Sequence, residues 1–461
     1  MIDMLPDDVL LEIFDFYTVI EIHYTPPGIS WWQTVTKVCR RWRYIILASP
    51  RRLDLRLHCS QITPVKRLLD IWPPFPIVLD CFALHSDDHE SVENLIAALE
   101  CYNRTSTIFI LCLKGSTLEK FFAVMQEPLP VLTHVNVTSL LENEPAPVLP
   151  ETFLGGSAPR LQSFSLHGIP FPSFPKFILS VTHITRLQLV DIPESGYVSP
   201  RVMVTSLAAL PNLKSLSVGF RSPLSRPLQI NPPPLMREFL PALTTLKFGG
   251  VSEYFEDLVA RIDTPLLKQL SVVFFMDLVF DIPQLHDFVA RTENLRPFNQ
   301  AEIQFSGRTI TAFLGSPTRI ELQIKCERSD WQLSSLTQIF SQRLPLLSHV
   351  EQLEIGEHPW ESVGWKWKDD PDMDSSLWLE LFQLFVAVQS LYVSKNLVLP
   401  VVAALQDLRV TGGTAVEVLP ALLNLSLEGL EPSGPVQEAI KSFVAARRLS
   451  DHPVATQRWD R

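Results

Sequence analysis

A short apolar motif that recurs along the chain restricts its fold more than any other feature of the sequence. The motif reads Leu-x-x-Leu-x-Leu, often after a proline, and occurs as PVLTHVNV, PRLQSFSL, THITRLQL, PNLKSLSV, PALTTLKF and PLLKQLSV. The first apolar residues of these copies are Leu132, Leu161, Ile184, Leu213, Leu243 and Leu267, at intervals of 29, 23, 29, 30 and 24 residues. One such unit leaves its apolar face exposed and a neighbouring copy buries it, so the spacing predicts a stack of repeats.

Weaker copies of the motif extend this pattern in both directions. HVEQLEI, AVQSLYV, ALQDLRV and PALLNLSL follow residue 348, EIQF and TRIELQI fill the interval before them, and RRLDLRL, FPIVLDC and TIFILCL precede residue 114. Amphipathic segments lie between many of the copies, at residues 88–100, 117–126, 199–210, 252–262, 333–344 and 376–388. Strands that alternate with helices form parallel sheets, so we predict an α/β fold with a parallel sheet.

The composition indicates a folded chain built from many short elements. The 461 residues exceed the size of one ordinary domain core, which allows several domains or one extended array. Hydrophobic residues make up 46% of the chain and charged residues 19%, with 27 Phe and 10 Trp, so a large apolar core is available. The 38 Pro against 17 Gly favour short strands and connectors over long helices.

Charge and the N-terminal residues limit the partners and the compartment. The net charge of -11 and the pI near 5.5 argue against a nucleic-acid binder, which needs clustered Lys and Arg. The first residues, MIDMLPDDVLLEIF, carry acids where a secretory signal is basic, and no apolar run approaches the roughly 20 residues of a membrane span. We therefore expect an intracellular, soluble protein of the cytoplasm, the nucleus or both, with no membrane partner.

The residues that could carry chemistry form no known catalytic or metal-binding motif. The six cysteines lack a CxxC pair, so we expect reduced, buried thiols and neither a disulfide nor a metal site. None of GxGxxG, GxxxxGK[ST], HExxH or GxSxG occurs. The segment from His85 to Glu90 could offer metal ligands, but adjacent loop residues rarely converge on one ion, and a helix start explains the same residues. We expect no enzyme activity and no cofactor; a hydrolase or transferase would rest on that segment alone.

The first fifty residues differ from the repeats and predict two amphipathic helices. The run Leu5-Pro6-Asp7-Asp8 is a helix start, because proline suits the first helical position and acids favour the positive end of the helix dipole. The apolar positions with helical spacing are Leu10, Ile13, Phe14 and Tyr17 in the first helix, and Val35, Val38, Cys39, Trp42 and Ile46 in the second. Further apolar residues widen the face of the first helix, so two short helices cannot bury all of this surface.

These residues resemble the F-box motif, over residues 4–50. LPDDVLLEIFDFY, with its Leu-Pro start and Ile13–Phe14 pair, is followed by VCRRWRYI in the F-box order. The resemblance implies docking on the Skp-type adaptor of cullin-RING (SCF) ubiquitin ligases, with the contact made or supported by Leu5, Pro6, Leu10, Phe14, Val38, Cys39 and Trp42. The link from Thr18 to Ser30 is longer than the family usually has. The alternative is that the two helices only cap the repeats.

The array resembles the irregular leucine-rich repeats that commonly follow F-boxes, and the whole chain is similar to the large F-box families of basidiomycete fungi. The resemblance implies an α/β fold in which a short all-helical F-box precedes an irregular leucine-rich-repeat solenoid with a curved parallel sheet. Its parts would be the F-box at 1–50, degenerate repeats at 51–130, the main array at 131–450 with an insertion near 356–377, and a C-terminal tail at 451–461. The Asn or Cys that the family usually has eight residues after the first leucine is absent at the six anchors named above.

The alternation of side chains along the strands predicts a binding face. Successive residues of a strand point to opposite faces of the sheet, so the residues between the motif leucines face outward. The candidates for contact with a target are Ser163, Ser165, His167, Arg186, Gln188, Lys247, Glu354, Tyr392, Asp407 and Arg409. This face is small, polar and nearly balanced in charge, which favours a hydrogen-bonding protein segment over a polyanion. The alternative is a merely solvated face, with specificity in the loops.

The tryptophans of the predicted insertion offer a second contact region. Trp360, Trp365, Trp367 and Trp378 either anchor a partner or pack against the edge of the array. Taken with the motifs above, the sequence predicts the substrate-recognition subunit of an SCF-type ubiquitin ligase, with an unknown protein target. The alternative is a leucine-rich-repeat scaffold with an F-box-like cap and no ligase role.

Overall fold

A computed structural model describes most of the chain. The described residues are 5–14, 31–49, 55–59, 65–82, 89–100, 103–139, 147–222, 236–275, 280–296, 298–317, 319–326, 328–341, 347–358, 375–407, 418–429 and 434–459. They divide into two compact units. The first unit comprises Met1–Val198 and Ala209–Leu213, and the second Ser199–Ala208 and Lys214–Arg461.

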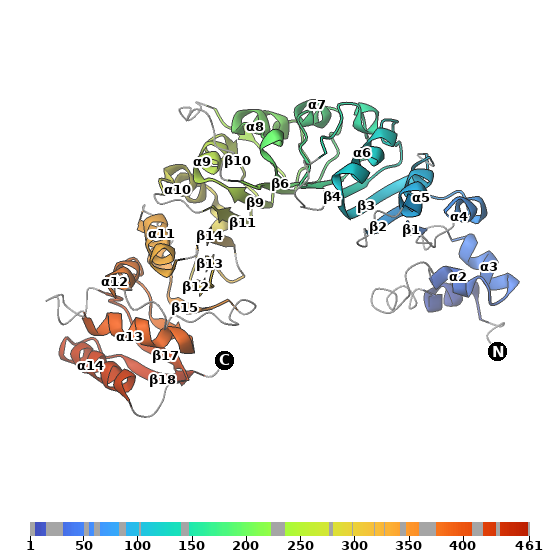
Figure 1. Ribbon diagram of the computed structural model, residues 1–461. Coiled ribbons are helices and arrows are strands. Elements are labelled where there is room, and N and C mark those ends of the chain that lie inside the picture. The colour runs from blue at the N-terminus through green and yellow to red at the C-terminus, as the bar shows by residue number, and fades with distance from the viewer. Residues whose placement is uncertain are drawn as a thin grey trace. The chain divides into compact units, whose positions relative to one another are not determined.

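The first unit begins with short helices and continues as a stack of parallel strands. Residues 7–14 are helical, followed by α2 (Trp31–Val35) and α3 (Arg40–Leu47). The stack contains β1 (Arg56–His58), α4 (Val65–Ile71), β2 (Ile77–Phe82), α5 (His89–Leu99), β3 (Thr105–Leu113), α6 (Gly115–Val124), β4 (His134–Ser139), η3 (Phe153–Gly156), β5 (Ser163–His167), α7 (Phe174–Ile178), β6 (Arg186–Ile192) and η4 (Glu194–Gly196). Each strand pairs in parallel with the next along the chain, and the helices lie along one face of the sheet (Figure 1).

The second unit continues the same alternation with one reversal. Its elements are α8 (Pro200–Ala208), β7 (Ser215–Phe220), β8 (Glu238–Phe239), β9 (Thr245–Gly250), α9 (Ser252–Ala260), β10 (Ile262–Asp263), β11 (Gln269–Phe274), α10 (Pro283–Arg291), η5 (Glu293–Leu295), β12 (Gln300–Phe305), β13 (Thr309–Leu314), β14 (Ile320–Lys325), α11 (Ser329–Ser341), η6 (Leu347–His349), β15 (Gln352–Glu357), α12 (Ser375–Gln383), β16 (Ser390–Val393), η8 (Lys395–Leu397), α13 (Val398–Asp407), β17 (Asn424–Glu428), α14 (Pro435–Leu449) and β18 (Ala455–Trp459). The strand order is β7-β9-β11-β14-β13-β12-β15-β16-β17-β18, and β8 pairs separately with β10.

This architecture confirms the predicted fold class: an α/β chain of stacked leucine-rich repeats with a mostly parallel sheet, after a short helical region. The strong motif copies form β4, β5, β6, β7, β9 and β11, and the weaker copies other than ALQDLRV also form strands. The six predicted helices are present within a few residues of their expected bounds. Residues 455–459 carry no copy of the motif, yet they form β18 beside β17.

The proline before many motif copies has a direct structural role. The N–H of Leu161 donates to the carbonyl of Ala158, and the N–H of Leu213 to the carbonyl of Leu210, so each closes a turn around the intervening proline. Proline is favoured at the second position of such turns because its φ is already set. The same bond recurs at Leu132, Leu243, Leu267 and Leu422. The turn therefore starts each strand in the same way.

A backbone ladder joins consecutive turns. The residue after the first motif leucine donates its N–H to the carbonyl of the equivalent residue one repeat earlier. Examples are Gln162 to Thr133, Thr185 to Gln162 and Lys268 to Thr244, each at 2.8 Å. Because the bond links equivalent positions, it sets the register in which the motif leucines of neighbouring repeats align.

Two strand predictions need correction. EIQF and TRIELQI were expected to form consecutive parallel repeats, but β13 lies between them and is antiparallel to both β12 and β14. The connection from Phe305 to Thr309 is a tight turn in which the Ser306 N–H donates to the Thr309 carbonyl. A turn this short has no room for a crossover helix, so the chain must reverse.

The second correction concerns ALQDLRV, which was predicted to form a strand. Its first part is helical. Asp407 is the last residue of α13, while Arg409 lies outside the described residues. The physical reason is the spacing of the buried residues Val398, Val401 and Leu405, which follows the helical and not the strand period. Asp407 therefore does not belong to the outward face of a strand.

Aromatic rings fill much of the space between sheet and helices. In the first unit Phe153, Phe164, Phe171 and Phe177 pack with ring centroids 5.2 to 6.4 Å apart. In the second unit a chain of neighbouring rings runs through Phe220, Tyr254, Phe248, Phe255, Phe274 and Phe280. This use accounts for much of the high Phe content.

Charged side chains on α9 and α10 join two adjacent repeats. The carboxylate of Glu256 accepts the backbone N–H groups of Gln284 and Leu285 at the start of α10, both at 2.7 Å. In return, Arg291 at the end of α10 donates to the carbonyl of Val259 in α9 (2.6 Å). Burial raises the pKa of Glu256 to about 7, against the lowering effect of these two N–H groups.

We predict that Leu267→Ala lowers the free energy of unfolding by about 2–5 kcal/mol, because it removes buried methyl groups and leaves a cavity between repeats. Leu267 is 0% exposed and its neighbour Leu266 is 50% exposed. Leu266→Ala is therefore a matched control, expected to stay within about 0.5 kcal/mol of the parent chain. Urea unfolding followed by circular dichroism measures both variants. Equal losses would contradict the assignment of Leu267 to the core.

The titration of Glu256 predicts a pH-dependent contribution to stability. A pKa raised from 4.5 to about 7 means that the folded state binds the proton more tightly, so this contribution is complete below pH 4.5 and is lost as pH rises through about 7. The difference in unfolding free energy between the parent chain and Glu256→Gln should thus fall by about 3 kcal/mol over that interval. Urea unfolding at pH 4.5, 6 and 8 measures it. A constant difference would show that Glu256 titrates normally.

Candidate functional site

One arginine and one aromatic pair hold the N-terminal helices together. The guanidinium of Arg41 in α3 donates to the Asp7 Oδ1 atom (2.6 Å) and to the backbone carbonyl of Leu5 (2.5 Å). Phe14 meets Trp42 edge to face, with ring centroids 4.9 Å apart. These contacts join residues 5–14 to α3. The described residues 5–14 and 31–49 together are named the N-terminal module below.

The seven predicted adaptor contacts differ in exposure. Leu10 and Phe14 are fully buried, Leu5, Cys39 and Trp42 are half-buried, and Pro6 and Val38 are exposed. The Cys39 thiol accepts the backbone N–H of Trp42 (3.4 Å) and so caps the start of α3. The structure therefore leaves Pro6 and Val38 open to a partner and gives Leu10, Phe14 and Cys39 internal roles.

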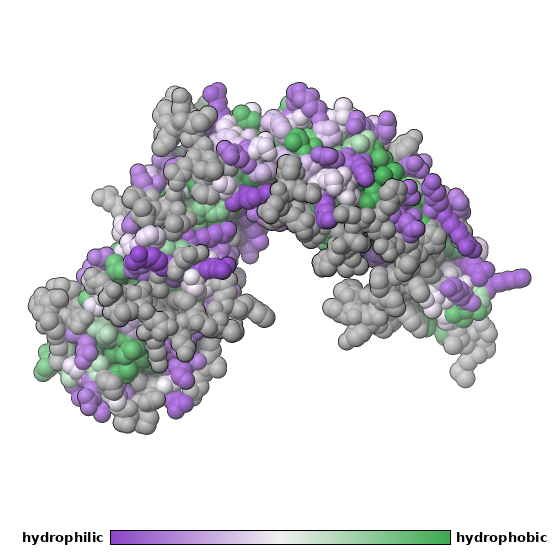
Figure 2. All heavy atoms as spheres, viewed as in Figure 1, coloured by the Kyte–Doolittle hydropathy of each residue, from purple (hydrophilic) through white to green (hydrophobic). Residues whose placement is uncertain are grey.

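Large apolar side chains remain exposed on the N-terminal module. Val38 is 60% exposed, Tyr44 is 74% exposed and Ile13 is 38% exposed. Figure 2 shows apolar residues in green among polar ones over these helices. Sequence reasoning did not select Ile13 and Tyr44 as contacts. A signal for Tyr44 was available, because it lies two positions after Trp42 on a helix and so faces away from it.

In the first unit, the structure brings four of the predicted target contacts together. Ser163 and Ser165 on β5 lie opposite Arg186 and Gln188 on β6, and the Ser165 hydroxyl donates to Gln188 Oε1 (3.2 Å). His134 on β4 lies opposite Ser163. Burial, and then the positive charge of Arg186, lower the pKa of His134. At neutral pH, this part of the face therefore carries the neutral imidazole of His134 beside the positive charge of Arg186.

Two carboxylates on the same face pair with cationic or imidazole partners. His167 Nε2 lies 2.5 Å from Asp191 Oδ2, where Asp191 has a φ of 50° near the end of β6. Asp80 Oδ2 lies 3.1 Å from Arg56 Nη1 and 3.5 Å from His58 Nδ1. Sequence reasoning selected His167 but missed Asp191 and Asp80. Aspartate tolerates a positive φ better than most residues, but nothing in the motif marks this position.

In the second unit, the predicted target contacts lie on separate elements. Glu354 on β15 lies directly opposite Tyr392 on β16. Lys247 is exposed on β9, and β11, β14, β13 and β12 lie between it and β15. Asp407 ends a helix, and Arg409 lies outside the described residues. Glu354 and Tyr392 are thus the pair that the structure places side by side.

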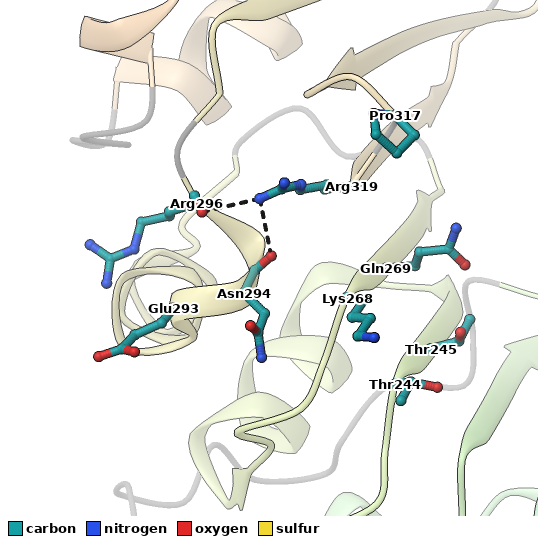
Figure 3. Close-up of a pocket in the computed structure, with 9 residues that line it drawn as sticks. All are labelled: Thr244, Thr245, Lys268, Gln269, Glu293, Asn294, Arg296, Pro317 and Arg319. Atoms are coloured by element: carbon teal, nitrogen blue, oxygen red, sulfur yellow. Dashed lines mark hydrogen bonds between the residues drawn. The ribbon is translucent and has the colours of Figure 1, made fainter.

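A hollow of about 780 Å³ opens at the amino ends of β9, β11 and β14, and is named the first hollow (Figure 3). The Arg319 guanidinium is fixed there by donating to the carbonyls of Asn294 (3.4 Å) and Arg296 (3.1 Å). Lys268 lies between Asn294 and Gln269, while the side chains of Glu293 and Arg296 extend away from the other residues. Arg296 donates to the carbonyl of Ala290.

A second hollow of about 440 Å³ lies over β12, β13, β15 and β16. Four of its lining residues follow one another across the strands in register: Phe313 opposite Glu302, Glu302 opposite Glu354, and Glu354 opposite Tyr392. The amide of Gln304 donates to Glu302 Oε1 (2.6 Å). Two carboxylates therefore stand between two aromatic rings. Sequence reasoning missed Glu302 and Phe313, because their placement depends on the reversal at β13.

The described part of the chain offers little for metal or nucleophilic chemistry. No group of three His, Cys, Asp or Glu residues among the described side chains could hold a metal ion. Burial raises the pKa of the Cys59 thiol, and burial together with Asp80 raises that of Cys81 to about 11, so neither forms a thiolate readily near neutral pH. Most of the segment from His85 to Glu90 lies outside the described residues, and Glu90 begins α5 with His89.

Of the four tryptophans in the tryptophan-rich segment, the structure describes Trp378. Trp378 is buried in α12 and packs on Phe305 and Phe382, with centroids 5.6 and 5.8 Å apart, so it belongs to the core. Trp360, Trp365 and Trp367 lie outside the described residues. Within the described ranges, no helix combines the length and the apolar character needed to cross a lipid bilayer.

Comparisons with known proteins add little to these observations. No model of a known protein family matches the chain, and no curated protein matches it significantly. Among solved structures, the crystal structure of the leucine-rich repeat-containing protein LegL7 from Legionella pneumophila matches at 14% identity, over 85% of this chain and 97% of that one, with a TM-score of 0.26. That score is low, so the repeat architecture rests on the strand order, the turns and the spacing of the motif.

The contacts of Arg41 predict that it stabilises the N-terminal module. We expect Arg41→Ala to speed amide hydrogen exchange in α3 by about fivefold, equivalent to roughly 1 kcal/mol, since the lost bonds are partly exposed. Arg40→Ala removes an exposed neighbour of the same charge and should leave exchange unchanged. Hydrogen exchange read by mass spectrometry over residues 31–49 tests this. Equal exchange in both variants would show that the Arg41 contacts do not stabilise the N-terminal module.

Proposed function

We propose that this chain is the substrate-recognition subunit, an F-box adaptor, of an SCF-type cullin-RING ubiquitin ligase. The N-terminal module would bind a Skp-type adaptor, and the repeats would hold a protein target. One observation carries the proposal: the module that contains the LPDDVLLEIF and VCRRWR motifs is internally fixed yet leaves Pro6, Val38 and Tyr44 exposed. Exposed apolar groups on so small a body gain free energy when a partner covers them.

The repeats suit the second half of this role. Their strands present rows of polar side chains in fixed register, and the two hollows give the face of the second unit shape and charge. In this proposal the chain carries out no chemistry itself. It raises the effective concentration of the target beside the conjugating enzyme, which is how a recruiting subunit accelerates transfer. The protein would act in the cytoplasm, the nucleus or both.

A second candidate keeps the fold and drops the ligase: a leucine-rich-repeat scaffold whose helices only cap the array. The full burial of Leu10 and Phe14 favours it, because two of the residues expected to meet an adaptor are already covered within the chain. The edge-to-face contact of Trp32 with Trp72 also ties the module to the first repeats. A pull-down that contains target proteins but neither adaptor nor cullin would select this candidate.

Truncation of the exposed apolar side chains tests the leading proposal. We expect the double variant Pro6→Ala, Val38→Ala to reduce co-purification of the Skp-type adaptor at least tenfold, because each lost contact is worth about 1 kcal/mol. Leu399→Ala, Leu449→Ala is the matched control, since both leucines are exposed on helices of the second unit. Circular dichroism shows whether each variant is folded. Unchanged adaptor recovery by a folded double variant would refute the assigned contact.

A further inference from the structure

The two hollows of the second unit adjoin each other and differ in charge. Both are lined by Pro317, in the connection between β13 and β14. They also share a row of backbone hydrogen bonds: the Leu270 N–H donates to the Arg319 carbonyl, and the Gly315 N–H donates to the Gln300 carbonyl, at 2.8 and 2.9 Å. The hollows therefore lie at the same edge of one sheet, on either side of Pro317.

The first hollow suits an anionic group. Lys268 is exposed, and the Arg319 guanidinium is oriented in advance by its two carbonyl acceptors, so binding an anion does not have to order it. The one carboxylate among the lining residues, Glu293, extends away from the others in Figure 3. The hydroxyl of Thr245 and the amide of Gln269 add neutral hydrogen-bonding groups. A carboxylate side chain matches this combination of charge and donors.

The second hollow suits a cationic group. Glu302 and Glu354 stand directly opposite each other, so two carboxylates of like charge meet at one place on the sheet. A cationic group of a partner would be attracted there. Phe313 and Tyr392 flank them in register and line the same hollow, and Tyr392 also packs edge to face with Trp459. Aromatic rings attract a guanidinium or ammonium group. Carboxylates and rings together recognise an Arg or Lys side chain better than either would alone.

We propose that the two hollows bind one extended segment of a target protein, with an acidic side chain in the first hollow and a basic side chain in the second. The inference rests on the proposed role of the repeats in holding a protein target, and it names the chemistry of that target. Charge complementarity selects the class of occupant. A nucleic acid would bring phosphate to both hollows and be repelled at the second, whereas a polypeptide can present opposite charges a few residues apart.

Selection of peptides on the purified full-length chain tests this inference. The probe is a phage library of random 12-residue peptides. We expect selected sequences to be enriched in one acidic and one basic residue, in a fixed order and at a fixed separation. On Lys268→Gln, Arg319→Gln the enrichment of the acidic residue should disappear while that of the basic residue remains. On Glu302→Gln, Glu354→Gln the reverse should hold. A peptide selected on the parent chain should bind each variant at least tenfold more weakly.

Matched controls keep the test specific. Arg319 also holds two carbonyls, so Lys268→Gln alone, which changes an exposed side chain, must weaken the selected peptide in the same direction. Lys247→Gln neutralises a charge on β9 that lines neither hollow, and it should leave affinity unchanged. Selection without charged residues, or an equal loss in this last control, would overturn the inference.

The outcome is independent of the ligase proposal. Bipolar peptides selected by a chain that fails to bind the Skp-type adaptor would support the binding face and refute the ligase role. Adaptor binding by a chain that selects peptides without opposite charges would support the ligase role and refute the assignment of the hollows.

Discussion

The backbone ladder between successive turns is the interaction on which the rest of the structure depends. The N–H after the first motif leucine of one repeat donates to the carbonyl of the equivalent residue in the repeat before, as from Lys268 to Thr244. Since each bond links equivalent positions, adjacent strands start in step. Their buried leucines then meet across the core, and their outward residues form straight rows. A slip of one residue would turn every row to the opposite face.

Proline-led turns and aromatic packing recur in these repeats, whereas the polar residue usual in regular leucine-rich repeats does not. The Asn or Cys expected eight residues after the first leucine is absent at the six regular anchors, from Leu132 to Leu267. At five of these six anchors, a turn before the strand closes around a proline. Rings such as Phe164 and Phe248 fill the space behind the strand. The repeats can therefore vary in length without losing their register, because the turn fixes only the start of each strand.

Sequence patterns predicted the regular part of the fold and failed where tertiary context decides. Strands β4, β5, β6, β7, β9 and β11 follow from leucine spacing, which is local information. The reversal at β13 depends on a three-residue turn after Phe305, and the motif does not extend there. ALQDLRV matched the motif, but the helical spacing of Val398, Val401 and Leu405 determined its structure. The sequence pattern could not predict the exposure of Val38 or the burial of Phe14 either, because both depend on how two helices pack.

The same reversal explains why half of the candidate site could be predicted and half could not. Alternation along the strands selected Glu354 and Tyr392, which lie on regular parallel repeats. Glu302 and Phe313 join them only because β13 runs backward between β12 and β14, which also returns the chain to the amino edge at Pro317. The break in the repeat therefore concentrates opposite charges and rings in one place, and specificity on such a scaffold is expected where its regularity ends.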